Sequence, residues 1–294
     1  MKKTLLYNMY VDGFVTEHKM YDIHKRCLMY YSHVFDKMIF YVNVNDLNNT
    51  VLIDDAINWI MEICGDKPYD IKVRKNTKLC ECETFREEIL LNRNAHKDTL
   101  VFFAHSKNVS RVDENLIPYV TNIPFLVDSV LKWSTTLYFY SLNFIDEMES
   151  RLLGCPLPPE IFYGPLMAQL RDPTTSPMLR MNKGNVFYAG CFWWLNVNKL
   201  FNYIDNDIIK LPEIDDRYWL EMLPGVIGGR EKFGDGCVSH NDVAIFDDFN
   251  LYISTPEIWD EIIYILSQGK DEGYWDFHYK MIEGIWGENR NENS

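Results

Sequence analysis

The chain has 294 residues, of which 47% are hydrophobic and 24% charged, so it is long enough to bury a large globular core. A formal net charge of −14 argues against a nucleic-acid partner, because binding to a phosphate backbone needs a basic surface. Seven cysteines, odd in number and without framework spacing, indicate a reducing compartment, and we expect a cytoplasmic protein.

Strand and helix patterns alternate along the first third of the chain. Apolar runs predict strands at 4–10, 37–42 and 99–104, and a further strand is predicted at 69–73. Helical spacing predicts helices at 16–35 and 54–64, the second ended by Gly65, and Thr84-x-x-Glu87 has the form of a capping box that opens a helix to about Ala95. This alternation predicts an α/β fold with a mostly parallel central sheet flanked by helices.

The later pattern is less regular. Helical, aromatic-rich spacing covers 124–153, Pro-rich stretches at 156–159 and 172–177 predict loops, and a capped helix is expected over 255–266. The polar tail at 287–294 is expected to be frayed. The amino terminus has the pattern of a first strand rather than a signal peptide, and no stretch has the length of a transmembrane segment.

The polar tripeptide His105-Ser106-Lys107 follows directly on the apolar run 99–104. That run has the character of a central strand covered on both faces. Open α/β sheets bind ligands in the crevice beyond such strand ends, and an imidazole and an ammonium there suit a diphosphate. The first strand should open on the same crevice. The plain alternative is a solvated strand exit with a satisfied histidine, which an isolated tripeptide would favour. The candidate ligand-binding residues are Tyr10, Val11, Asp12, His105, Ser106, Lys107 and Arg111.

Two adjacent tryptophans, Trp193 and Trp194, follow Gly190 in a strand-like apolar run. Successive strand side chains point to opposite faces, so both cannot face one core. We expect one to be buried and the other to line a cleft, where an aromatic face holds a sugar ring or a base and Gly190 lets a ligand approach the backbone. The alternative, a wide aromatic core that contains both, is equally open.

In their order along the chain, these motifs resemble those of a family of bacterial capsule and exopolysaccharide glycosyltransferases, with relatives in large DNA viruses, that have the GT-A fold. The family has a strand ending in H-[ST]-K-G, a segment containing a Trp, a G-N-F-W-W stretch and an Arg-x-x-x-Glu helix. The corresponding residues, over roughly 4–225, are His105-Ser106-Lys107-Asn108, Trp133, Gly190-Cys191-Phe192-Trp193-Trp194 and Arg217 to Glu221. Asn108 replaces the family's glycine, and Cys191 replaces its asparagine.

The resemblance implies a GT-A-like glycosyltransferase, a hexosyl- or pentosyltransferase of capsule, polysaccharide or viral glycan synthesis. Its donor would be a nucleotide sugar, with a UDP-linked sugar as the first expectation, and its acceptor a glycan or glycoconjugate hydroxyl. Transfer would invert the configuration of the sugar's anomeric carbon. We expect one domain over 1–294, with a nucleotide-sugar-binding half at 1–112 and an acceptor and catalytic half at 113–270. The residues implied for acceptor or sugar binding are Gly190, Trp193, Trp194 and Arg217.

Asp216 and Glu221 are the acid/base candidates. If 215–223 is helical, Arg217 and Glu221 share a face, where a plain i,i+4 ion pair explains them as well as catalysis does. The resemblance favours Glu221 as general base, with Asp216 in reserve.

The sequence leaves the use of Mn or Mg open. Asp205-Asn206-Asp207 has the Asp-x-Asp form that GT-A enzymes commonly use for a metal, but it does not follow a buried strand, and we interpret it as a solvated loop. Lys107 can stabilise a leaving diphosphate by its fixed charge. If a metal is used, His105 and His240 are the candidate ligands.

Two rival functions stay open. One is a non-catalytic carbohydrate-binding protein of a glycan-synthesis pathway that uses Trp193 and Trp194 as a sugar platform. The other is a glycoside hydrolase with Glu221 and Asp216 as its carboxylates. A hydrolase would ignore nucleotides, whereas a transferase would be stabilised by one of them.

Overall fold

The structure is a computed structural model that describes residues 1–106 and 191–207 continuously. Between and beyond these ranges it describes residues 142, 153, 161–163, 167–169, 186–188, 210–211, 213–214, 219–220 and 223. Leu142 and Leu153 are helical, as the pattern over 124–153 predicts. The rest of that range, the loops at 156–159 and 172–177, the helix at 255–266 and the tail at 287–294 lie outside the described residues.

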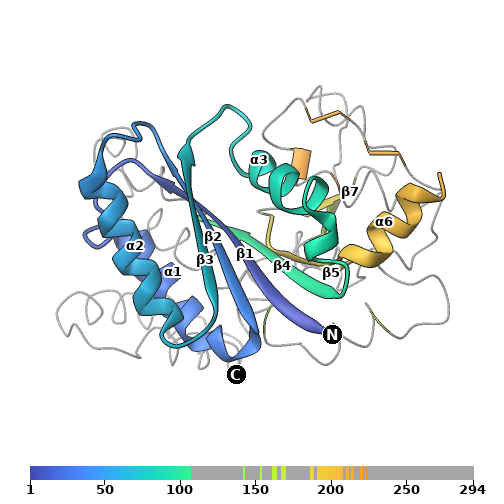
Figure 1. Cartoon of the computed structure of the whole chain (residues 1–294), viewed down its shortest axis with the longest axis horizontal. Helices are drawn as coiled ribbons and strands as arrows, with labels where there is room; N and C mark the ends of the chain where they lie inside the picture. The colour runs from blue at the N-terminus through green and yellow to red at the C-terminus, as the bar shows by residue number, and fades with distance from the viewer. Residues whose placement is uncertain are drawn as a thin grey trace, which may run out of the picture.

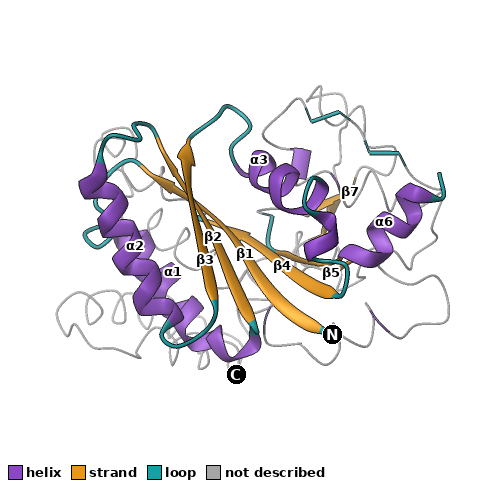
Figure 2. Ribbon diagram, in the orientation of Figure 1, coloured by secondary structure: helices purple, strands orange, loops and turns teal. Residues whose placement is uncertain are grey.

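A six-stranded sheet with the order β3-β2-β1-β4-β8-β5 organises the described part of the chain (Figure 2). Its first four strands in the sequence are parallel: β1 (Lys2–Val11), β2 (Lys37–Val44), β3 (Tyr69–Lys75) and β4 (Thr99–His105). β8 (Trp193–Asn196) runs antiparallel to β4 and to β5 (Phe162–Tyr163). A separate ladder joins β6 (Met167–Gln169) to β7 (Val186–Tyr188). The predicted mostly parallel α/β sheet is confirmed.

Helices cover both faces of this sheet (Figure 1). One face carries α1 (Lys19–Tyr30), which continues as a 3-10 turn over Tyr31–Val34, and α2 (Thr50–Cys64). The other face carries α3 (Glu81–Phe85) and α6 (Val197–Asp205). The chain thus winds outward from β1 to β3 over one face and crosses to β4 over the other, which makes the gap between β1 and β4 the topological switch point.

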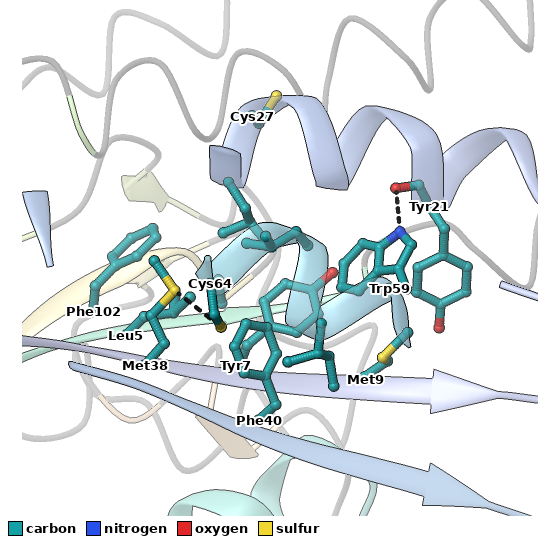
Figure 3. Close-up of a cluster of buried hydrophobic side chains, with 14 of the residues drawn as sticks. Leu5, Tyr7, Met9, Tyr21, Cys27, Met38, Phe40, Trp59, Cys64 and Phe102 are labelled. Atoms are coloured by element: carbon teal, nitrogen blue, oxygen red, sulfur yellow. Dashed lines mark hydrogen bonds between the residues drawn. The ribbon is translucent and has the colours of Figure 1, made fainter. Parts of the chain in front are cut away.

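Alternating residues of the central strands fill two separate cores. Leu5, Tyr7 and Met9 of β1 face α1 and α2, whereas Leu6 faces α3. Trp59 of α2 is buried against Tyr21 of α1, with ring centroids 5.5 Å apart, and its Nε1 donates to the Tyr21 carbonyl oxygen at 3.3 Å (Figure 3). This bond ties the two helices together above β1.

Both helices on this face begin at residues that the apolar spacing did not mark. α1 begins at Lys19 rather than at 16, and its N-cap His18 accepts a hydrogen bond at Nδ1 from the Met20 N–H at 3.2 Å. α2 begins at Thr50, four residues before the predicted start, because the Asn49 side chain caps it. It ends at Gly65, as predicted, where φ is 53°.

The predicted capping box at Thr84 is wrong. α3 begins at Glu81, so Thr84 lies inside it, and its hydroxyl donates to Asn8 Oδ1 at 2.6 Å rather than capping a helix. The expected helix to Ala95 is divided into α3, a π-helical turn over Arg86–Leu90 and a 3-10 turn over Arg93–Ala95.

A buried carboxylate holds the π-helical turn against the sheet. Glu88, 2% exposed, accepts hydrogen bonds from Tyr41 Oη at 2.7 Å, from His96 Nε2 at 2.7 Å and from the Lys72 ammonium. Burial alone would raise the pKa of Glu88, but the hydrogen bonds from His96, Lys72 and Tyr41 together lower it to about 2. The folded protein therefore keeps this carboxylate charged.

Glu88→Gln should lower the free energy of unfolding at pH 7 by about 3 kcal/mol, because the folded-state pKa lies below the ordinary value of 4.5. A depressed pKa stabilises the fold above about pH 4.5, and this contribution disappears as the pH falls towards 2. Urea unfolding at pH 7, 5 and 3 measures it. The difference between wild type and variant should shrink at pH 3, and Glu62→Gln, at the exposed partner of Lys25, should show little effect at any pH. A loss from Glu88→Gln that does not change with pH would contradict this assignment.

Candidate ligand site at the carboxyl edge of the sheet

The carboxyl ends of β1 and β4 lie side by side, with Asn8 opposite His105 in the strand register. Ser106, the first residue after β4, donates its backbone N–H to the Asn8 carbonyl at 2.9 Å and accepts at Oγ from the Tyr10 N–H at 3.0 Å. The hydroxyl thus takes the place of a strand carbonyl and extends the β1–β4 pairing. The two strand exits singled out from the sequence lie next to each other at the switch point, while their contact with a ligand stays a prediction.

The described ligand candidates differ in how accessible they are. Asp12 is exposed, and Tyr10 and His105 are half-buried at the edge. Val11 is buried in the core beneath α1 and α2, so its side chain is not open to a ligand. Ser106 is 9% exposed and its hydroxyl is engaged by Tyr10, so in this structure it holds strands together rather than facing a crevice.

Tyr21 is a residue of this site that sequence reasoning missed. Its hydroxyl donates to the Tyr10 carbonyl oxygen and also interacts with the Ser106 hydroxyl. Burial raises the pKa of Tyr21 well above its ordinary value, so the hydroxyl stays protonated and remains a donor. The one available signal was its place in the first turn of the helix after the first strand's exit.

A second polar cluster lies on the α3 side of the same edge. Asn43 Nδ2 donates to Asn8 Oδ1 at 2.9 Å, and Arg74 donates to Asn43 and to the Thr84 hydroxyl. Arg74 also stacks on the Tyr41 ring, 4.8 Å from its centroid, and forms a 3.0 Å ion pair with Glu87. This half-buried cation is therefore paired with Glu87 within the protein, and the cluster supports the strand ends from below.

The expectation that one of the two tryptophans lines a cleft is wrong, because Trp193 and Trp194 are both 0% exposed. They do point to opposite faces, as predicted. Trp194 lies 5.2 Å from Phe102 in the core beneath α1 and α2, and Trp193 stacks at 5.2 Å on Phe103 in the other core. β8 is an inner strand between β4 and β5, covered on both faces, so the wide aromatic core is the correct alternative.

The Asp205-Asn206-Asp207 segment has the solvated character expected of it. All three residues are exposed at the end of α6, and Asp205 forms a 2.7 Å ion pair with Arg93. Of the two candidate metal ligands, His105 lies at the sheet edge with its ring 5.8 Å from Phe192, and His240 lies outside the described residues.

Several candidates lie outside the part of the chain that the structure describes, and their roles stay predictions. They are Lys107, Arg111, Trp133, Gly190, Asp216, Arg217, Glu221 and His240.

Comparison with known proteins adds no relative: no protein-family model matches this chain, and no curated protein matches its sequence. In the described ranges, no helix has the length and apolar character needed to cross a membrane.

The loop after β1 offers a direct test of ligand approach. A side chain at Gly13 would meet no atom within 4 Å, so Gly13→Leu should fold and melt within about 2 °C of wild type. If a nucleotide lies over the loop, the added bulk should weaken UDP binding at least about tenfold in isothermal titration calorimetry. Lys97→Leu, exposed before the amino end of β4, is the control and should bind as wild type does. Equal UDP affinity in wild type and Gly13→Leu would place the ligand elsewhere.

Proposed function

We propose that this protein is a GT-A-like glycosyltransferase that transfers a sugar from a nucleotide diphosphate donor to a glycan hydroxyl with inversion. The observation that carries the proposal is the switch point, where Tyr10 bonds Ser106, His105 lies opposite Asn8, and the exposed Asp12 follows β1. In open parallel sheets, ligands with phosphate groups commonly bind there. The sugar-transfer part rests on the ordered motifs of the sequence resemblance.

The chemistry assigned to each residue follows from its charge and place. Lys107, the second residue after β4, would face the diphosphate and stabilise its charge as the sugar departs. Glu221 would take the proton from the acceptor hydroxyl, with Asp216 in reserve, because an inverting displacement has no covalent intermediate to divide the step. A divalent metal, if one is bound, would add positive charge at the diphosphate and would be held by His105 and His240.

The burial of both tryptophans weighs against the rival carbohydrate-binding function. Such a platform needs an exposed aromatic face, and Trp193 and Trp194 are enclosed by aromatic neighbours on opposite faces of the sheet. A hydrolase would have no use for a nucleotide at the switch point. Nucleotide binding therefore separates the proposed transferase from both rivals.

A thermal-shift screen of the full chain against UDP-, GDP- and dTDP-sugars, with and without manganese, tests this function. A ligand at a hundred times its Kd stabilises the folded state by about 2.7 kcal/mol, which is several degrees in melting temperature. The matching free monosaccharides are the control and should give a smaller shift. Stabilisation by a monosaccharide or an oligosaccharide but by no nucleotide sugar would favour a rival.

Glu221→Gln should lower sugar transfer by about 10²–10⁴ while donor affinity stays near that of wild type, since a general base contributes that factor in rate. The measurement is the initial rate of transfer together with the donor Kd for each variant. If Glu221→Gln keeps full activity, or unfolds the protein, Glu221 is an ion-pair partner of Arg217, and Asp216→Asn becomes the next variant to measure.

A further inference from the structure

The loop between β1 and α1 is anchored to α2 by a single carboxylate. Asp55 Oδ2 accepts hydrogen bonds from the backbone N–H groups of Val15 and Thr16, at 2.6 and 3.2 Å. Asp55 Oδ1 accepts from the Thr16 hydroxyl at 2.6 Å. Three bonds to a charged acceptor hold the far end of the loop, and charge-assisted bonds of this kind are stronger than neutral ones.

The end of β1 that leads into this loop is anchored from α1. The Tyr21 hydroxyl donates to the Tyr10 carbonyl oxygen, and the Tyr10 N–H is bonded to Ser106. Tyr10 is therefore held through both of its backbone groups.

Both anchors depend on one face of α2. Trp59 contacts Tyr21 edge-on and bonds its carbonyl oxygen, and Asp55 lies four residues earlier, so the two side chains share a helical face. Between the anchors, Asp12, Gly13 and Phe14 are all exposed, Phe14 to 44%. The loop thus presents a short exposed tip on a base that is fixed at both ends.

We propose that Asp55 and Tyr21 are positioning residues that preorganise the Asp12–Phe14 tip for the nucleotide of the donor, an inference that rests on the proposed function. Neither residue needs to touch the ligand. If an anchor is lost, the tip occupies its binding conformation for only part of the time, and the apparent Kd rises in inverse proportion to that fraction.

Two variants remove one anchor each, and each has a matched control. Asp55→Asn leaves a single acceptor oxygen for three donors, with Asp54→Asn as the same change at the exposed neighbouring position. Tyr21→Phe keeps the ring against Trp59 and removes only the hydroxyl, with Tyr31→Phe as the same change at a buried tyrosine beyond the far end of α1. All four are made in the full chain.

The first measurement is amide hydrogen exchange of Val15 and Thr16. The second is the Kd of each variant for UDP, GDP and dTDP, with each nucleotide tested separately at a temperature well below the melting temperature. We expect Asp55→Asn to speed exchange at both amides. We expect both anchor variants to raise the Kd of the bound nucleotide about five- to tenfold. This is the increase expected if the fraction of molecules with the tip in its binding conformation falls to about 10–20%. The two controls should stay within twofold of wild type. A purely structural role would change melting temperature and exchange but not the Kd.

Each outcome decides a separate point. If wild type binds a nucleotide and the anchor variants bind it equally well, the positioning role is overturned and the proposed function stays intact. Controls that weaken binding as much as the anchor variants do also overturn it. Wild type that binds none of the three nucleotides overturns the proposed function and this inference with it.

Discussion

Burial of the central strands on both faces is the constraint on which the rest of this structure depends. β1, β2, β4 and β8 have helices or buried aromatic residues above and below them, so their side chains must be apolar on both faces. Buried Asn8 and Asn43 lie where β1 and β2 approach the carboxyl edge, and there polar side chains must satisfy one another. Asn8 and Asn43 do so by bonding each other and by drawing in Arg74 and Thr84.

Two kinds of polar contact then do different things. The Glu88 cluster fastens the crossover from β3 to β4, and its carboxylate makes the fold sensitive to acid. The bonds around Tyr10 act at the switch point, where they extend the β1–β4 pairing and fix the base of an exposed loop. The first cluster secures the crossover without which β4 would not lie beside β1. The second fixes the edge at which we propose that a ligand binds.

Much of this fold is predictable from local pattern. Apolar runs locate β1, β2 and β4, because a strand covered on both faces has no polar alternation, whereas β3 is mostly exposed and mixes polar with apolar residues. The errors there are informative: the predicted strands stop short at residues 42, 73 and 104, and the omitted residues include Asn43, Arg74 and His105. Asn43 and Arg74 remain in the strands because tertiary partners satisfy them: Asn43 bonds Asn8, and Arg74 bonds Asn43 and Thr84. Sequence reasoning missed Asp55 and Tyr21, and gave Thr84 the wrong role, for a related reason. Their partners lie 40, 11 and 76 positions away, and periodicity carries no information about such pairs.

The position of β8 has a consequence for how the protein is made. β4 ends at His105, but the strand that covers its open edge, and the tryptophans that complete both aromatic cores around Phe102 and Phe103, begin only at Trp193. At synthesis rates of about 5–20 residues per second, several seconds pass on the ribosome before that edge is closed. During this time the nascent chain exposes an unpaired, apolar strand, which is a template for intermolecular pairing. A fragment cut soon after β4 would lack β8 and the two tryptophans, and would keep that apolar edge exposed.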